Sequence, residues 1–359
     1  MNKYTLLIVA IAAAIFVSCK KEKAESSQSI NDPSSSENVV ASPVPFAGNY
    51  WQVRATFPPM VTRSGACSFV IGNKAYVFGG YANGFKRDLW EYDPATNKWT
   101  SKADMPLPGK ARTNAVAFAI NGKGYVATGD VEFSQAEGYN VRDLWEYDPI
   151  LNRWLRKKDL PGNSRGRAVG FAINNKGYVA TGGNEQVDGM MDDVWEYTPA
   201  TDTWVSKGKW TKPGDDMGRY HASAFVIGNK AYVGTGFGAS NNAVSNCLND
   251  FWEYNPATNT WTQKANFGGG PRANADGLAS STTGYIGLGY YIDPNNGNVF
   301  DTRDYWSYNP STDTWTKRAD FPGVIRSTAT GFFVNGYGYL GLGTHNGSLN
   351  TNDFYKYVP

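Results

Sequence analysis

A unit of roughly 50 residues recurs from Arg63 to the last residue, and this repeat limits the possible folds more than any other feature of the sequence. Each unit opens with Arg-x-x-Ala, has a tyrosine thirteen residues after the arginine and a glycine four residues later, and ends in an aromatic segment that follows an aspartate. A period of this length indicates units that stack on one another or close into a ring. The opening arginines are Arg63, Arg112, Arg165, Arg219, Arg272 and Arg326.

Each unit contains four short segments rich in β-branched and aromatic residues, which predict four antiparallel strands, A to D. Asn and Gly between A and B, and between C and D, are typical of tight hairpin turns. The last unit ends after strand C at Pro359, whereas Trp51 lies in a strand D that precedes the first unit. We therefore expect an all-β, six-bladed propeller over residues 49–359, with four-stranded blades and an N-terminal outer strand that completes the last blade.

These residues resemble the kelch family of β-propellers, in which a second strand ending in glycine is followed by an aromatic strand with a tryptophan. The resemblance covers residues 49–359, but the double glycine of the family is present only at Gly79-Gly80 and Gly182-Gly183. The family includes substrate adaptors, a copper radical oxidase and sugar mutarotases, so the resemblance alone implies no single chemistry. The residues that replace the usual first glycine are Thr128, Thr181, Thr235, Leu288 and Leu342.

The N-terminus predicts export and a lipid anchor. The apolar run from Leu6 to Val17 is too short to span a membrane and is typical of a signal peptide. Ser18-Cys19 resembles a bacterial lipobox of the Bacteroidetes type, so we expect residues 1–18 to be removed, Cys19 to be lipidated and residues 19–48 to be a disordered Ser-rich tether. The expected location is the cell envelope, at the outer membrane and facing either the periplasm or the cell surface. The alternative is a plain secretory signal with an incidental cysteine.

The composition restricts the partners. The chain has 34 Lys and Arg against 32 Asp and Glu, so it lacks the strong positive charge of a nucleic-acid-binding protein. Cys67 and Cys247 fall on opposite sides of the predicted ring, so we expect two free thiols rather than a disulfide. We expect a monomer without a cofactor or bound metal.

The loops between strands B and C, and between strand D and the next strand A, share one face of the predicted ring. Seven residues separate Gly80 from Asp88, but fourteen separate Gly289 from Asp304. Variable loops on a rigid scaffold are common binding surfaces. In kelch substrate adaptors, arginines that resemble the six repeat arginines contact acidic groups of bound peptides, which makes four of them candidates for binding a carboxylate or sulfate. The alternative is that the arginines pair with the aspartates that open strand C. These four candidates are Arg112, Arg165, Arg219 and Arg272.

Other candidate residues fall on the same face. Tyr220-His221 resembles an adjacent pair in the copper site of galactose oxidase, but this chain has only one other histidine, so we expect these residues to bind a ligand by hydrogen bonds or to pack on the surface. Asp276 is a polar residue on an inner strand. Trp210 occupies a position that is apolar in the other units, which predicts burial. The remaining ligand-binding candidates are Asp215, Asp216 and Tyr290, of which the two aspartates also fit a solvated loop.

The sequence thus predicts a membrane-anchored propeller whose loop face binds a glycan or a protein without converting it. The alternative is a carbohydrate-active enzyme, either of the mutarotase type or of the galactose oxidase type. A pair of carboxylates at a defined separation would favour glycoside hydrolysis, but sequence alone does not fix such a distance.

Overall fold

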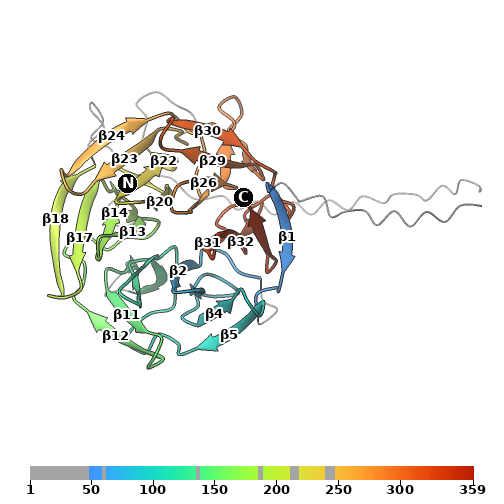
Figure 1. Cartoon of the computed structure of the whole chain (residues 1–359). Coiled ribbons are helices and arrows are strands. Elements are labelled where there is room, and N and C mark those ends of the chain that lie inside the picture. Colours follow the sequence, from blue (N-terminus) through green and yellow to red (C-terminus); the bar gives the residue numbers. More distant parts are fainter. Residues whose placement is uncertain (1–47, 59–61, 135–137, 185–188, 211–217, 239–246) are drawn as a thin grey trace, which may run out of the picture. The chain divides into compact units, whose positions relative to one another are not determined.

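The computed structural model describes residues 48–58, 62–134, 138–184, 189–210, 218–238 and 247–359. Residues 47–359 form one compact unit, and its described part contains strands but no helix. Six four-stranded antiparallel sheets, here called blades 1 to 6, correspond to the six repeat units. Figure 1 shows them around one centre. The innermost strands contact one another in the order β2, β7, β13, β20, β25 and β31, and β31 contacts β2, so the ring is closed.

The chain runs outward through each of blades 1 to 5, from the innermost strand A to the outermost strand D. Blade 1 comprises β2 (Cys67–Ile71), β3 (Lys74–Phe78), β4 (Leu89–Asp93) and β5 (Lys98–Lys102). Blade 2 comprises β7 (Val116–Ile120), β8 (Lys123–Ala127), β11 (Leu144–Asp148) and β12 (Arg153–Lys157). Blade 3 comprises β13 (Val169–Ile173), β14 (Lys176–Ala180), β17 (Asp193–Thr198) and β18 (Thr203–Lys209).

The same order continues in the second half of the ring until the last blade, which takes its outer strand from the N-terminal side. Blade 4 comprises β20 (Ser223–Ile227), β21 (Lys230–Gly234), β23 (Phe251–Asn255) and β24 (Thr260–Lys264). Blade 5 comprises β25 (Asp276–Ala279), β26 (Gly284–Gly287), β29 (Tyr305–Asn309) and β30 (Thr314–Lys317). Blade 6 comprises β31 (Thr330–Val334), β32 (Tyr337–Gly341), β35 (Phe354–Val358) and β1 (Tyr50–Arg54).

Strand β1 closes the ring as the sequence predicts, and Figure 1 shows it beside the C-terminal strands. Trp51 pairs in register with Tyr357. Its indole Nε1 donates a hydrogen bond of 3.0 Å to the carbonyl of Ala319, in the chain segment that connects blade 5 to blade 6. Asn49 adopts a φ of 74° and accepts a hydrogen bond from the Tyr357 hydroxyl. In blade 1, Asn97 in the turn between C and D does the same for Tyr92, so the two chain ends together rebuild the turn of an ordinary blade.

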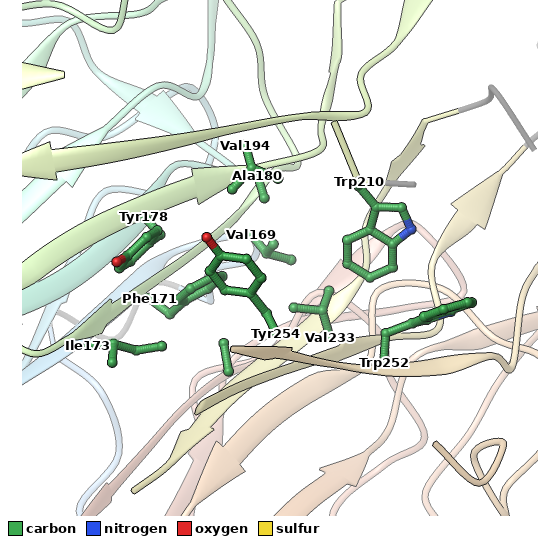
Figure 2. Close-up of a cluster of buried hydrophobic side chains, with 11 residues drawn as sticks. Val169, Phe171, Ile173, Tyr178, Ala180, Val194, Trp210, Val233, Trp252 and Tyr254 are labelled. Carbon is green, nitrogen blue, oxygen red and sulfur yellow. The ribbon is translucent and has the colours of Figure 1, made fainter. Parts of the chain in front are cut away.

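Aromatic side chains fill the spaces between blades. Phe69 of blade 1 stacks on Tyr76 at 5.1 Å and also contacts Tyr147 of blade 2. Gly124 makes this close approach possible, because a Cβ atom there would lie 2.1 Å from the Phe69 ring. Trp210 is buried against Trp252, as predicted, at a centroid distance of 6.4 Å (Figure 2). Burying a large aromatic side chain contributes about 2–3 kcal/mol, so these contacts are a main source of stability.

The loops after strand B form small additional sheets on one face of the ring, here called the loop face. None of the described residues belongs to a helix that could cross a membrane. The sheet in blade 2 combines β6 (Arg112–Thr113), β9 (Asp130–Ser134) and β10 (Gly138–Asn140). The two-stranded sheets are β15 (Gly183–Asn184) with β16 (Gly189–Met190), β19 (Arg219–Tyr220) with β22 (Phe237–Gly238), β27 (Tyr290–Ile292) with β28 (Val299–Asp301), and β33 (Thr344–His345) with β34 (Leu349–Asn350).

Candidate functional site

The six repeat arginines are buried, and each forms two parallel hydrogen bonds to the aspartate that opens strand C of its own blade. In blade 4, Nη1 and Nη2 of Arg219 lie 2.8 and 2.7 Å from the two carboxylate oxygens of Asp250. Such planar bidentate pairs combine charge with fixed geometry. The pairs are Arg63–Asp88, Arg112–Asp143, Arg165–Asp193, Arg219–Asp250, Arg272–Asp304 and Arg326–Asp353.

In blades 2 to 6 the arginines also bind the turn at which the chain departs from the double-glycine pattern. Nη1 of Arg112 donates a hydrogen bond of 3.0 Å to the carbonyl of Thr128, which stands where the family has its first glycine. Thr128 has a φ of 59°, and Leu288, which is bound in the same way by Arg272, has a φ of 60°. A residue other than glycine in this left-handed region costs about 1–3 kcal/mol. The hydrogen bond from a buried cation helps to offset this cost, so the turn survives without the glycine.

The charge of these pairs is maintained in spite of burial. Burial raises the pKa of the Asp143 carboxyl, but the charge and hydrogen bonds of Arg112, with the hydrogen bond from the Trp145 indole, outweigh it and hold the pKa below its usual value. The pKa of Asp193 is lowered by the same balance, with Arg165 as its partner. Both carboxylates are therefore ionised at neutral pH.

The structure thus shows the aspartate pairing that was one of the two interpretations of the arginines. Arg112 and Arg165 have no solvent exposure, and Arg219 and Arg272 are also buried. A ligand carboxylate would have to displace an existing bidentate partner to reach any of these guanidinium groups. Ligand-binding groups must therefore lie elsewhere on the loop face.

Six equivalent residues, each two positions after a repeat arginine, form a second ring at the entrance of the central channel. All six have φ between 51° and 61°. The N–H of each donates a hydrogen bond of 2.8–3.3 Å to the carbonyl of its counterpart in the preceding blade, and the N–H of the first donates to the last, so the hydrogen bonds close a circle. We call these residues the mouth ring; they are Gly65, Asn114, Arg167, His221, Asn274 and Thr328.

The side chains of the mouth ring differ although their backbone geometry is the same. They line a cavity of about 140 Å³ that leads into the channel between the inner strands. Asn114 and Arg167 both donate hydrogen bonds to Oδ2 of Asp130, at 2.8 and 3.1 Å. Because the backbone circle does not depend on side-chain identity, these side chains can differ from blade to blade without disturbing the ring.

Two half-buried side chains at this entrance contain buried polar atoms that have no hydrogen-bond partner among the described residues. Neither ring nitrogen of His221 has a hydrogen bond, and burial, assisted by the nearby charge of Arg167, lowers the pKa of His221 to about 3. Oδ2 of Asp276 is also unpaired, and burial raises the pKa of this carboxyl to about 7. Asp276 lines both the mouth cavity and a deeper channel cavity of about 180 Å³. Buried polar groups usually have partners, so these two groups indicate a site that takes up water or a polar ligand.

The structure brings together three of the predicted candidates beside the mouth ring. Tyr220 stacks on Phe237 at 5.1 Å and lies edge-on to His221 at 5.0 Å. The Arg167 guanidinium lies 5.9 Å from the Tyr220 ring centroid. Burial, followed by the nearby Cys247 and Tyr220 side chains, raises the pKa of Tyr290 far above its usual value. The candidates Cys19, Asp215 and Asp216 lie outside the residues that the structure describes.

The described residues include no group of three or more His, Cys, Asp or Glu side chains arranged to hold a metal ion. The two histidines lie in different places. His221 belongs to the mouth ring, whereas Nδ1 of His345 lies 2.8 Å from the carbonyl of Ile325, which precedes blade 6 in the chain. Cys67 and Cys247 are not joined in a disulfide, as predicted. Burial raises the pKa of Cys67 to about 12 despite the opposing charge of Arg112, so this thiol is not activated as a nucleophile.

The loop face also carries the exposed aromatic side chains. Among the described residues, every Phe, Tyr or Trp that is more than 40% exposed lies in a loop between strands B and C. Two pairs lie across hairpins: Phe133 contacts Tyr139 at 4.7 Å, and Tyr291 contacts Phe300 at 5.3 Å. Sequence reasoning missed this gathering, because the residues come from loops of different lengths with no shared pattern. The exposed aromatic residues are Tyr81, Phe133, Tyr139, Tyr291 and Phe300.

Known proteins are similar to this chain in sequence or in structure. Kelch-like protein 25 of Xenopus tropicalis is 25% identical over 80% of this chain, which spans 45% of that protein. The N-(sulfonatooxy)prop-2-enimidothioate sulfolyase of Thlaspi arvense is 26% identical over 79% of this chain and 88% of its own length. A solved structure titled "Structure of YjhT" superposes with a TM-score of 0.67 at 16% identity, covering 84% of this chain and 95% of that one.

Two family descriptions match the sequence itself. The KLHDC2/KLHL20/DRC7 Kelch-repeats domain matches residues 47–232, which is more than half of the chain, and the Kelch motif matches residues 218–268. Together the matched ranges include the N-terminal closing strand and the first four blades. The chain therefore belongs to the kelch-repeat family of β-propellers.

Proposed function

We propose that the protein is a binding module whose loop face holds a polypeptide or a glycan without converting it. The observation that carries this proposal is the restriction of the exposed aromatic side chains to the loops after strand B. Aromatic residues are enriched at interfaces because they bury a large area and lose little conformational entropy on binding. The propeller itself does not need these side chains, because they project outside the blades.

The mouth ring supplies polar contacts near the same surface. His221 and Asp276 have unpaired buried atoms that would gain hydrogen bonds from a polar group entering the channel. A gain of this kind favours a ligand with complementary donors and acceptors over one that lacks them. The aromatic loops would then supply contact area, and the mouth ring would supply selectivity.

The alternative is a carbohydrate-active enzyme. Asp276 favours it, because a carboxyl with a pKa of about 7 inside a channel is suited to general acid-base chemistry. The relative from Thlaspi arvense that matches most of the chain is also named as an enzyme. Under this alternative, Asp276→Asn abolishes turnover of a sugar substrate while binding remains.

We also propose that the propeller is anchored in the cell envelope through lipidated Cys19. Support comes only from the apolar run and the Ser18-Cys19 junction of the sequence. A labelled fatty acid should be incorporated into the wild-type protein and not into Cys19→Ala. Labelling of both, or of neither, would contradict the anchor and leave the binding proposal unaffected.

A combined glycan and peptide screen on the purified full chain tests the binding function. A variant with serine at the five exposed aromatic positions should lose binding, whereas Ile150→Ser should retain it, because Ile150 is 90% exposed in the turn between strands C and D of blade 2. His221→Asn should alter ligand preference with little effect on folding, since asparagine occupies the equivalent positions in blades 2 and 5. Equal binding by wild type and the five-serine variant would refute the role of the loop face.

A further inference from the structure

A cavity of about 650 Å³ lies on the loop face between blades 1 and 2, formed by different residues from the mouth ring. Three segments of the chain form its walls: the loop after β3, the connection from β5 to β6, and strand β9. We call it the blade 1–2 groove. Its volume is within the range of sites that bind a ligand side chain or a small molecule. The side chains that matter for its chemistry are those of Phe85, Arg87, Leu107, Lys110, Glu132 and Phe133.

The groove has apolar walls that are accessible to solvent. Leu107 is 79% exposed and Phe133 is 52% exposed, although both are large apolar side chains beside a concave surface. The Phe133 ring packs against the Tyr139 ring, and the Phe85 ring packs edge-on against the Tyr81 ring at a centroid distance of 5.5 Å. Exposed apolar side chains around a hollow are typical of a surface that a partner covers. A bulky apolar group would bury the faces of both Leu107 and Phe133.

The backbone around the groove is fixed before any partner arrives. The N–H of Met105 donates a hydrogen bond of 3.0 Å to the carbonyl of Arg87, and the N–H of Arg112 donates one of 2.8 Å to the carbonyl of Lys86. These bonds join the loop of blade 1 to the connection that leads into blade 2. A wall that is already ordered lowers the entropy lost on binding.

The charge of the groove favours an acidic partner. Arg87 and Lys110 line it, against the single carboxylate of Glu132. No carboxylate of the described residues forms an ion pair with Arg87, in contrast to the six buried repeat arginines. A guanidinium at the edge of an apolar groove can bind a carboxylate bidentately.

We propose that the blade 1–2 groove binds a polypeptide segment in which a bulky apolar residue is flanked by acidic residues. The apolar side chain lies between Leu107 and Phe133, and an adjacent carboxylate pairs with Arg87. This inference rests on the proposed binding function and names the class of ligand and the place where it docks. Apolar walls combined with a cation suit such a segment better than a glycan, whose surface is mostly hydroxyl groups.

Arrays of short synthetic peptides with blocked ends, applied to the purified full chain, test the ligand class. One array has a central Glu-Phe-Glu, a second has Lys-Phe-Lys and a third has Glu-Ser-Glu, with the flanking positions randomised in all three. We expect binding to the first array to exceed binding to the other two by roughly tenfold or more, because both the apolar anchor and the charge contribute. Equal binding to the first two arrays, or no binding above background to any of them, would overturn the inference.

Variants then locate the site on the protein. Leu107→Ser, Phe133→Ser and Arg87→Glu should each weaken binding of the best Glu-Phe-Glu peptide by about tenfold. Ile150→Ser, an equivalent change outside the groove, should have no effect. If the groove variants bind normally and Tyr291→Ser with Phe300→Ser does not, the loop-face function stands and the groove assignment is wrong. Self-association that Phe133→Ser abolishes would show that a second copy occupies the groove, and would also overturn the inference.

Discussion

Replacing Arg165 with alanine should destabilise the propeller without a direct effect on ligand binding. Arg165 is fully buried, and its guanidinium donates hydrogen bonds to Asp193, to the carbonyl of Thr181 and, at 3.1 Å, to the carbonyl of Asn163. Alanine would leave a carboxylate and a buried carbonyl without their cation. Breaking a buried ion pair from one side typically costs about 3–5 kcal/mol. The Asp193 side chain is 30% exposed, so water can reach it. We therefore expect the free energy of unfolding to fall by about 3 kcal/mol, at the lower end of that range.

Denaturant unfolding of the wild type and the variant at neutral pH measures this difference. Arg156→Ala is the matched control, because Arg156 is 48% exposed and forms a surface ion pair with Asp159 three residues away; this pair should contribute less than about 1 kcal/mol. A variant that combines Arg165→Ala with Asp193→Ala should lose less free energy of unfolding than the sum of the two single variants, because each single change removes the same interaction. A loss below about 1 kcal/mol in Arg165→Ala, or weaker ligand binding with unchanged stability, would refute the scaffold role of the arginine.

The dependence on pH has a defined sign. The pKa of Asp193 is lower in the folded protein than the usual value, because the effect of Arg165 exceeds the opposing effect of burial. The pair therefore stabilises the fold above about pH 4, and this contribution disappears as the pH falls through the lowered pKa. The difference between wild type and Arg165→Ala should shrink accordingly in acid. A difference that stays constant down to pH 2 would contradict the charge-based explanation.

Two further changes test the closure of the ring and the channel. Trp51→Ala should lower the free energy of unfolding by about 3 kcal/mol, because the indole packs on Tyr305 and Phe321 and donates a hydrogen bond to Ala319. Val53→Ala on the same strand, at a position that is 72% exposed, should change it little. Equal thermal unfolding of the two variants would contradict closure by β1. Burial raises the folded-state pKa of Asp276 to about 7. Wild-type stability should therefore fall as the pH rises from about 4 to 7, because the unfolded state releases this proton first. Asp276→Asn should remove this decrease and be more stable than wild type at pH 8, as chemical denaturation at several pH values would show. The same pH profile in wild type and variant would show that the folded protein does not raise the pKa of this carboxyl.

Most of the fold could be predicted from the sequence, because the repeat fixes both the strands and their order. Trp51 before the first unit and the missing strand D after the last one predict the closing strand, and the structure confirms it. The burial of Trp210 followed from its position in the repeat and is also confirmed. These predictions succeed because they depend on features that all six units share.

The candidate site was less predictable, because it depends on the features in which the units differ. The mouth ring residue of one blade is glycine and that of another is histidine, so residue identity does not reveal their common φ. Asparagine at positions 114 and 274, with Gly65, was the available signal, since these residues tolerate the left-handed region. The blade 1–2 groove combines Arg87, Leu107 and Phe133 from three separate loops, and only the folded chain brings them together.

The pairing of β1 with β35 has a consequence for the order in which the protein can mature. The ribosome makes β1 before any blade exists, yet its partner β35 is made after all the other strands of the six blades. Until then, blades 1 to 5 can form one after another, but blade 6 is incomplete and Trp51 lacks the strand with which it pairs. A chain truncated before Phe354 would therefore leave blade 6 without β35, and the hydrogen-bonding edges of β1 and β32 that flank this strand would both be unpaired.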